Sequence, residues 1–412
     1  MSEDLRELVD VAVGLGQAGG FDEQVAPLGV ARVAEVDGDL HDLSEILGNL
    51  DVESLWAGYD WSLDDPRVVA AVERALARPG LTVRERTLLT TALAAELTYA
   101  DNARSNHLFA DARALAEDLD DPVLSAGVLL RWFCSVSGPS GVEERASIGD
   151  QLIALDSDGS LPARLRPLAH LARVSSALEL GDGALARRCV ADAPALAHPV
   201  RTPTGWAHLQ FAEAGLALLD GDLERAKGHA AALRPALQRV RRYTADSSPA
   251  SILAVVEAHS GDIDAALGRL TPLLASPYAE PIRWLEAWVL SEGGRLDEAG
   301  AALAGFDGPL PDDWLQLPLT TAAVHAAARV GDLRFLRRHL PNLEAVADRF
   351  AFLGEGGFTL GPAALAVAAG HLAHDEPTAA RPHAEQAVAI AERMGAVLWI
   401  PRARRLLASL RS

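Results

Sequence analysis

Three glycines near the start of the chain have the spacing of a nucleotide-binding motif. Gly14, Gly16 and Gly19 form a GxGxxG pattern, and Asp37 and Asp39 follow further along. In a dinucleotide-binding domain such glycines let the backbone approach a pyrophosphate at a helix N-terminus, and the acidic residue binds the ribose. The motif has this meaning only between a strand and a helix, so the elements around it must be established first.

Residues with the spacing of a catalytic site are scarce elsewhere in the sequence. Lys227 is the single lysine, so the chain has no GxxxxGK[ST] phosphate-binding loop, and a lysine Schiff base could involve only this residue. The GxSxG, HExxH and SxxK patterns of three other enzyme classes are also missing from the sequence. We therefore expect no cofactor, and the sequence favours a non-enzymatic function.

Histidine and cysteine spacing gives little support for a metal site. His371 and His374 could place two imidazoles on one helix face, but the sequence identifies no third ligand. Histidines that decorate a helix end are the more frequent explanation. Cys134 and Cys189 stand alone, so neither a disulfide framework nor a structural zinc is indicated. We predict no metal.

The composition is that of a large, acidic, helix-forming chain. Of its 412 residues, 49% are hydrophobic and only 5% aromatic, and the formal net charge is −20. Such a charge repels nucleic-acid backbones and anionic membrane surfaces. No apolar run approaches the length of a membrane span, and the N-terminal residues are acidic where a signal peptide is basic. We expect a cytoplasmic protein that binds neither nucleic acid nor membranes.

Two short arginine clusters interrupt this acidic background, at residues 239–242 and 402–405. Each could form a local anion site. Solvated helix faces, or helix C-termini where cations complement the dipole, are the favoured interpretation.

A turn motif recurs along the chain and predicts which secondary-structure elements surround the GxGxxG glycines and the other candidate residues. It consists of a glycine in segments such as "DGDLERAK" and "SGDIDAAL". The glycines are Gly19, Gly181, Gly221, Gly261, Gly294 and Gly331. The last five are separated by 40, 40, 33 and 37 residues, which is the period of a helical hairpin.

Small and apolar residues recur at fixed distances from these glycines. The residue two later is apolar in all but one repeat. The residue seven earlier is always small: Ala12, Val174, Ala214, Ala254, Ala287 or Val324. The residue five later is Gln24, Ala186, Ala226, Ala266, Ala299 or Leu336. The pattern predicts a first helix that ends in a left-handed glycine cap, and two antiparallel helices that approach closely through small residues.

This pattern resembles the tetratricopeptide repeat, whose turn has the form Gly-Asp-apolar-x-x-Ala. The resemblance implies an all-α fold, a right-handed superhelical solenoid of antiparallel helix hairpins. The opening GxGxxG stretch fits this repeat better than a dinucleotide fold, because apolar residues have helical spacing before Gly19 and Pro27 would fall inside the required helix.

Between Gly19 and Gly181 the repeat is degenerate. A turn is expected at residues 100–102, with Ser105 as the small residue, and Pro122 is expected to open the next helix. Residues 140–143 have the spacing of a capping box. Loops are expected from Asp156 and from Phe306.

We predict one solenoid over residues 1–412. A weak subdivision would separate degenerate repeats at 1–155 from regular repeats at 163–412, which end in a C-terminal capping helix. Neither of the two expected loops is long enough to be a clear interdomain linker.

The C-terminal segment carries a more particular likeness. It contains a Gly-Pro motif, the run "AERMGAVLW" and an arginine-bearing last helix. In these features it resembles the helical-repeat tail of large bacterial ATP-dependent LuxR-type (MalT-like) regulators and related signal-transduction ATPases, over about Trp56 to Leu410. In that family the tail binds small-molecule inducers or partner proteins and restrains an ATPase module. The resemblance implies a sensor or adaptor without the ATPase and DNA-binding modules.

In tetratricopeptide repeats the first helix of each hairpin lines the concave face, and the resemblance transfers those positions to this chain. The candidate ligand-binding residues are His208, Phe211, Val255, His259, Trp284, Trp288, Glu292, His325 and Arg329. Aromatic faces with a few charges suit a ligand that has apolar surface and polar handles. The alternative places Trp284 and Trp288 in the core between repeats.

These residues predict a regulatory or adaptor solenoid that binds a small molecule, a peptide or a protein partner in its concave groove. An enzyme or accessory protein of bacterial specialised metabolism, using the same groove, is the alternative. A purely structural scaffold is the third possibility.

Overall fold

The structure is a computed structural model. It describes residue 55 and residues 66–410, except 137, 158, 240–245, 276–278, 306–307, 309, 311 and 355. The GxGxxG stretch, Gly19 and the residues aligned to it lie outside the described residues.

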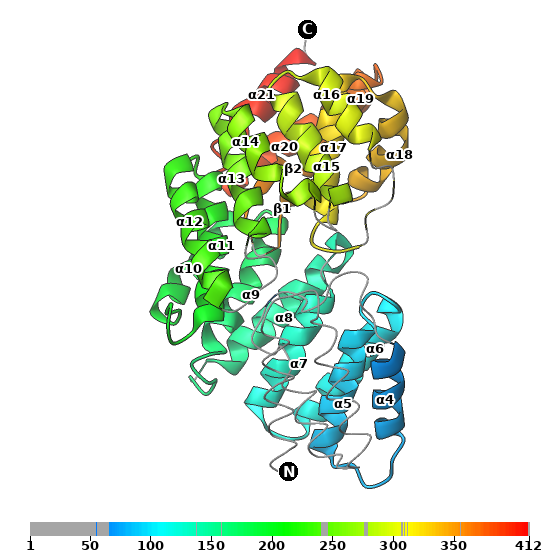
Figure 1. Ribbon diagram of the computed structural model, residues 1–412, viewed down its shortest axis with the longest axis vertical. Helices are drawn as coiled ribbons and strands as arrows, with labels where there is room; N and C mark the ends of the chain where they lie inside the picture. Colours follow the sequence, from blue (N-terminus) through cyan, green and yellow to red (C-terminus); the bar gives the residue numbers. More distant parts are fainter. Residues whose placement is uncertain are drawn as a thin grey trace.

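The described chain is an α-helical solenoid in which consecutive helices pack against each other (Figure 1). The early helices are α4 (Pro66–Leu76), α5 (Val83–Glu96), α6 (Asn102–Glu117), α7 (Pro122–Ser135) and α8 (Val142–Leu155). The central pairs are α9 (Arg166–Glu179) with α10 (Gly183–Asp192), α11 (Pro203–Leu219) with α12 (Leu223–Arg239), α13 (Ser247–Ser260) with α14 (Ile263–Leu270), α15 (Ala279–Glu292) with α16 (Leu296–Ala304), and α17 (Gln316–Val330) with α18 (Leu333–Glu344). None of the helices described here is long and apolar enough to cross a membrane.

The turn glycines adopt the predicted left-handed conformation. Their φ angles lie between +74° and +83°, and each glycine follows the first helix of a pair. They are Gly181, Gly221, Gly261, Gly294 and Gly331. In most turns the next residue is an aspartate that caps the second helix; the carboxylate of Asp262, for example, accepts a hydrogen bond from the backbone N–H of Ala265 at 3.2 Å. This cap satisfies an otherwise unpaired donor and fixes the start of each second helix.

The residues seven before and five after each turn glycine are buried, as a close contact between paired helices requires. All the described members of both sets are completely buried. The set before the glycine is Val174, Ala214, Ala254, Ala287 and Val324, and the set after it is Ala186, Ala226, Ala266, Ala299 and Leu336. The first helices also pack on one another in order, from α9 to α11 and from α13 through α15 to α17. One hydrophobic core therefore extends through the repeats.

The earlier helices agree with the expectations from the sequence, with one correction. Asp101 caps α6, Ser105 is buried against α5, and Pro122 begins α7 after the cap Asp121. Ser140 does not cap a helix: it lies in a 3₁₀ turn (Pro139–Gly141), and its hydroxyl donates to the carboxylate of Asp312. A contact with the distant loop before α17 replaces the expected local capping box.

The C-terminal segment adds a β-hairpin that the sequence analysis did not predict. Strands β1 (Phe350–Phe352) and β2 (Thr359–Pro362) pair antiparallel, with Phe350 opposite Pro362 and Phe352 opposite Thr359. The chain then continues into α19 (Ala363–Ala373), α20 (Pro377–Met394) and α21 (Ile400–Ser409). Strand β1 contacts both α9 and α17, so the hairpin connects repeats that are distant in sequence.

Candidate functional site

The predicted groove residues lie on the first helices of four pairs. Helix α11 carries His208 and Phe211, α13 carries Val255 and His259, α15 carries Trp284, Trp288 and Glu292, and α17 carries His325 and Arg329. These helices form the layer that faces the β-hairpin, because α11 and α17 both contact its strands. The residues therefore come from neighbouring first helices; five of the nine are buried, Glu292, His259 and His325 are half-buried, and Arg329 is exposed.

Burial places the two tryptophans in the core between repeats, the alternative that the sequence left open. Trp284 is 1% exposed and Trp288 is 2% exposed. The ring of Trp284 makes edge-to-face contacts with Phe335 and His339 of α18, at centroid distances of 5.5 and 5.1 Å. His208, Phe211 and Val255 are buried as well. These five side chains stabilise the array and present no surface to a ligand.

The β-hairpin loop fills the space over α11. A Cβ atom on Gly215 would overlap the carbonyl oxygen of Gly356, and one on Gly357 would overlap the ring of Phe211. Gly356 also lies against Leu178 of α9 and has a φ of +104°, a conformation that favours glycine. The glycine-rich loop of the hairpin is therefore pressed against the helices that were expected to bind a ligand.

The start of α21 covers the remaining part of the predicted site. The ring of Trp399, which is buried, makes an edge-to-face contact with His259 at a centroid distance of 5.1 Å. On its other side His259 makes a similar contact with Trp288 at 5.5 Å. An imidazole from the repeats is thus enclosed by one indole of the core and one indole of the C-terminal segment.

Glu292 connects two repeats with α21. Its carboxylate, with the side chain 15% exposed, accepts from Arg329 Nη1 at 2.9 Å and from Arg402 Nη2 at 2.9 Å. Arg402 Nη2 also lies 3.4 Å from His259 Nδ1. Glu292 and Arg329, two of the predicted site residues, are therefore paired with each other. We call these four residues, with His325, the inner-face cluster.

Arg402 was not among the predicted site residues, although its arginine cluster was noted. The favoured interpretation of that cluster as a solvated helix face describes Arg404, whose exposed side chain pairs with Glu392 at 2.6 Å. Arg402 instead points into the repeats. Arg402 and Arg404 are two residues apart, so they lie on different faces of α21. Nothing in the sequence near Arg402 indicates that its partner is Glu292, which is distant in the chain.

The imidazoles of the inner-face cluster are held neutral. Burial, together with the charge of Arg402, lowers the pKa of His259 to about 3. Burial lowers the pKa of His325 to about 3 as well, with further contributions from Arg402 and Arg329. Both rings are therefore uncharged at neutral pH. The cluster has one carboxylate shared by two guanidinium groups, an arrangement that suits recognition of a cationic group.

A second feature is an open hollow of about 570 Å³ along α8. Its lining is Glu143, Ala146, Ser147, Asp150, Gln151, Ala154 and Leu180. Both carboxylates in this lining are already paired, Glu143 with Arg349 at 2.6 Å and Asp150 with Arg173 at 2.8 Å. The hollow is therefore a weaker candidate for a charged ligand than the inner-face cluster.

Comparisons with known proteins assign the chain to no family. No family model matches the sequence, and no curated protein matches it either. Among solved structures, the chain is similar to one chain of the crystal structure of the APC/C hetero-tetramer Cut9–Hcn1, with 13% sequence identity and a TM-score of 0.26. The match covers 99% of this chain and 96% of that chain. The geometry of its own turns and helix pairs makes this protein an α-solenoid of tetratricopeptide-like hairpins.

Proposed function

We propose that this protein is a regulatory or adaptor solenoid that binds a cationic peptide or protein segment at the inner-face cluster, in competition with its own α21. The observation that carries the proposal is the ion pair between Arg402 and Glu292, next to His259. These are the contacts that a bound arginine-bearing peptide would make. The likeness of the C-terminal segment to the tails of LuxR-type regulators motivates the regulatory part of the proposal.

The burial of α21 supports a helix that can be displaced. Between Trp399 and Leu410, the buried residues at its two ends, only Ala403 of the ten residues of α21 is fully enclosed, whereas the hairpin strands β1 and β2 are buried throughout. Its main packing partner is α20, through Leu406, Leu407 and Leu410. A helix with few buried apolar contacts opens at a lower free energy than the core around it.

The charge of the molecule favours a basic partner. The formal net charge of −20 attracts cationic segments, and such attraction raises association rates. Because α21 is attached to the chain, it competes at a high effective concentration, on the order of millimolar for a short connection. Partner binding would therefore be weak until Arg402 is disengaged.

A labelled peptide that copies residues 396–410 tests this proposal. Fluorescence polarisation would compare its binding to the native chain and to the Arg402→Ala variant. Loss of one charge-assisted hydrogen bond in the competitor is worth about 1.5–3 kcal/mol, so we expect the variant to bind the peptide at least tenfold more tightly.

Adding Glu292→Gln to the Arg402→Ala variant provides the matched control. It should abolish the gain, because the peptide arginine then has no carboxylate to bind. Arg404→Ala, which alters an exposed residue of the same helix, should bind the peptide as the native chain does. Equal binding by the native and Arg402→Ala proteins would contradict the competition.

A further inference from the structure

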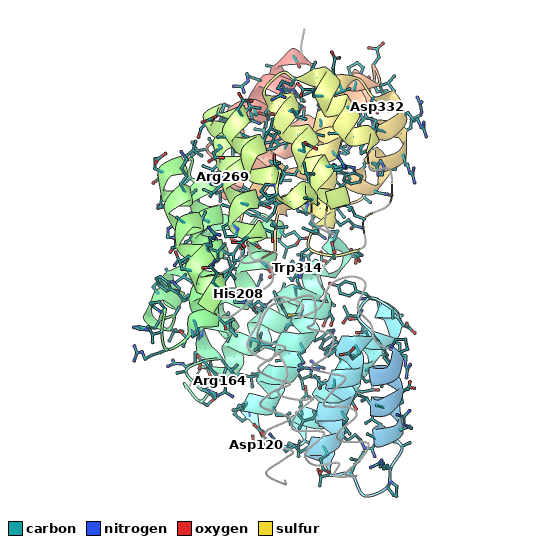
Figure 2. The ribbon with its side chains drawn as sticks, viewed as in Figure 1. Asp120, Arg164, His208, Arg269, Trp314 and Asp332 are labelled. Atoms are coloured by element: carbon teal, nitrogen blue, oxygen red, sulfur yellow. The ribbon has the colours of Figure 1, made fainter. Side chains whose placement is uncertain are left out.

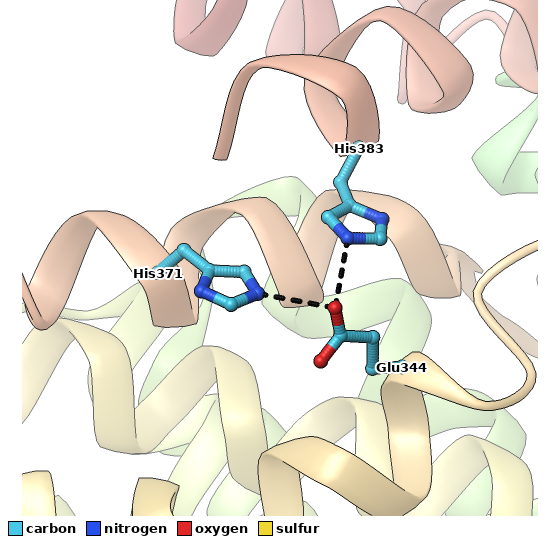
Figure 3. A group of neighbouring side chains, drawn as sticks. All are labelled: Glu344, His371 and His383. Carbon is cyan, nitrogen blue, oxygen red and sulfur yellow. Dashed lines mark hydrogen bonds and ion pairs between the residues drawn. The ribbon is translucent and has the colours of Figure 1, made fainter. Parts of the chain in front are cut away.

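Three helices, α18 of the last repeat pair with α19 and α20 of the C-terminal segment, bring two histidines and a glutamate together away from the inner-face cluster (Figure 3). Glu344 is the last residue of α18, His371 lies in the last turn of α19, and His383 lies on α20. One ligand atom from each residue lies within 4.8 Å of the other two. The sequence analysis considered His371 with its neighbour His374; the structure instead pairs His371 with residues on two other helices.

The two distances from the imidazoles to the carboxylate match those between ligands of one small cation. His383 Nε2 lies 3.2 Å from Glu344 Oε1, and His371 Nε2 lies 3.5 Å from the same oxygen. Metal–ligand bonds of about 2.0–2.1 Å in a tetrahedron place neighbouring ligand atoms roughly 3.3 Å apart. The two imidazole planes are nearly parallel, at 7°, with centroids 5.6 Å apart, and the rings reach the same carboxylate oxygen from different directions (Figure 3).

A second carboxylate orients His371. Its Nδ1 lies 2.8 Å from Glu376 Oε2, and the side chain is only 12% exposed. A carboxylate bound to the far nitrogen of a metal-ligating imidazole fixes its tautomer and increases its basicity. When Nδ1 donates its hydrogen to Glu376, the lone pair of Nε2 is available to a metal ion beside Glu344. Nε2 is buried and accepts no hydrogen bond.

We propose that Glu344, His371 and His383 bind a divalent zinc ion. Two imidazole nitrogens and one carboxylate are ligands that Zn²⁺ prefers, whereas Mg²⁺ and Ca²⁺ select oxygen ligands alone. Three protein ligands leave a fourth position for water. The ion would join the ends of α18 and α19 to α20. It would thereby hold α20, the helix on which α21 packs, in place.

The purified full-length chain, stripped of metal with a chelator and dialysed, tests the site by calorimetric titration with zinc chloride. We expect one equivalent to bind saturably and to raise the melting temperature by mass action. Titration with Co²⁺ should give the intense visible absorption of a four-coordinate ion. Absence of saturable binding near one equivalent would overturn the proposal.

Variants assign the binding to these residues. Glu344→Gln keeps the size of the side chain and should lose zinc binding while the metal-free protein melts as the native one does. Glu376→Gln, which removes only the orienting carboxylate, should weaken binding about 10–100-fold. His374→Ala is the matched control and should retain native affinity. Native zinc affinity in both Glu344→Gln and His383→Ala would place the metal elsewhere and overturn the proposal.

Discussion

The guanidinium carbon of Arg145 lies 4.9 Å from the ring centre of Trp314, and this contact joins the start of α8 to the loop before α17. Figure 2 labels Trp314 in that loop. Arg145 is completely buried. It donates to the carbonyl oxygens of Val136 and Gly138 and pairs with Glu179 of α9. Burial raises the pKa of the Glu179 carboxyl, and the charge of Arg145 opposes that shift. One arginine therefore links early and late repeats.

Replacing Arg145 should be strongly destabilising. Arg145→Met leaves the Glu179 carboxylate buried without its partner, and breaking a buried ion pair in this way costs about 3–5 kcal/mol. Urea unfolding followed by circular dichroism would measure the loss. The double variant Arg145→Met with Glu179→Gln should recover part of that loss, because the unpaired charge is gone. A double variant no more stable than Arg145→Met would show that the cost does not come from the carboxylate.

The close approach of the β-hairpin to α11 gives a second prediction. Gly215→Ala should destabilise the protein by about 1–3 kcal/mol, because the added methyl group overlaps the backbone of Gly356 and forces the hairpin outward. Gly228→Ala in α12 is the matched control: nothing lies within 4 Å of its Cβ position, and alanine stabilises a helix interior by roughly 0.5–1 kcal/mol over glycine. If both variants gained stability, the hairpin would not be seated on α11.

The repeat pairs could be predicted from the sequence because their signal is local. A glycine that must adopt a positive φ, with small residues seven before and five after it, specifies one helix end and one close helix contact. The hairpin was missed because its strands are only three and four residues long and lie in a chain dominated by helical periodicity. Its aromatic residues on both sides of a glycine-rich turn were the available signal.

The candidate site was only partly predictable for a related reason. Glu292 and Arg329 occupy equivalent positions in neighbouring repeats, so the repeat period alone brings them together at 2.9 Å. The contacts of Trp399 and Arg402 depend on how the C-terminal segment folds back over distant helices. No spacing within α21 contains that information, so the sequence could not show that this segment contacts the predicted site residues.

The helix contacts at the alanines give a third prediction. Ala226→Leu and Ala266→Leu should each lower the free energy of unfolding by about 1–3 kcal/mol, because both alanines are completely buried where paired helices meet. Ala408→Leu, at an exposed position of α21, is the control and should change stability by less than about 0.5 kcal/mol. Unchanged unfolding of both buried variants would mean that the pairs are less closely packed than the structure shows.

The neutral imidazoles of the inner-face cluster predict a loss of stability in mild acid. His259 and His325 have folded pKa values of about 3, below the ordinary value of 6.5. Below pH 6.5 the unfolded chain takes up a proton at each histidine, whereas the folded chain stays neutral. The free energy of unfolding therefore falls as the pH drops from 6.5 towards 3. Between pH 6.5 and 5.5 each histidine contributes a loss of roughly 1 kcal/mol.

Asp313 opposes this trend, so it must be removed before the histidine effect is measured. Burial raises its pKa to about 7, from an ordinary value of 3.8. The folded chain therefore binds a proton there that the unfolded chain lacks, which adds stability as the pH falls from 7 towards 3.8. In an Asp313→Asn background, urea unfolding at pH 6.5 and 5.5 should show a larger fall in the free energy of unfolding than in the native chain. Adding His325→Leu should reduce that loss by roughly 1 kcal/mol, because one proton-binding site of the unfolded chain is removed. An acid loss unchanged by His325→Leu would mean that this imidazole is protonated in the folded protein.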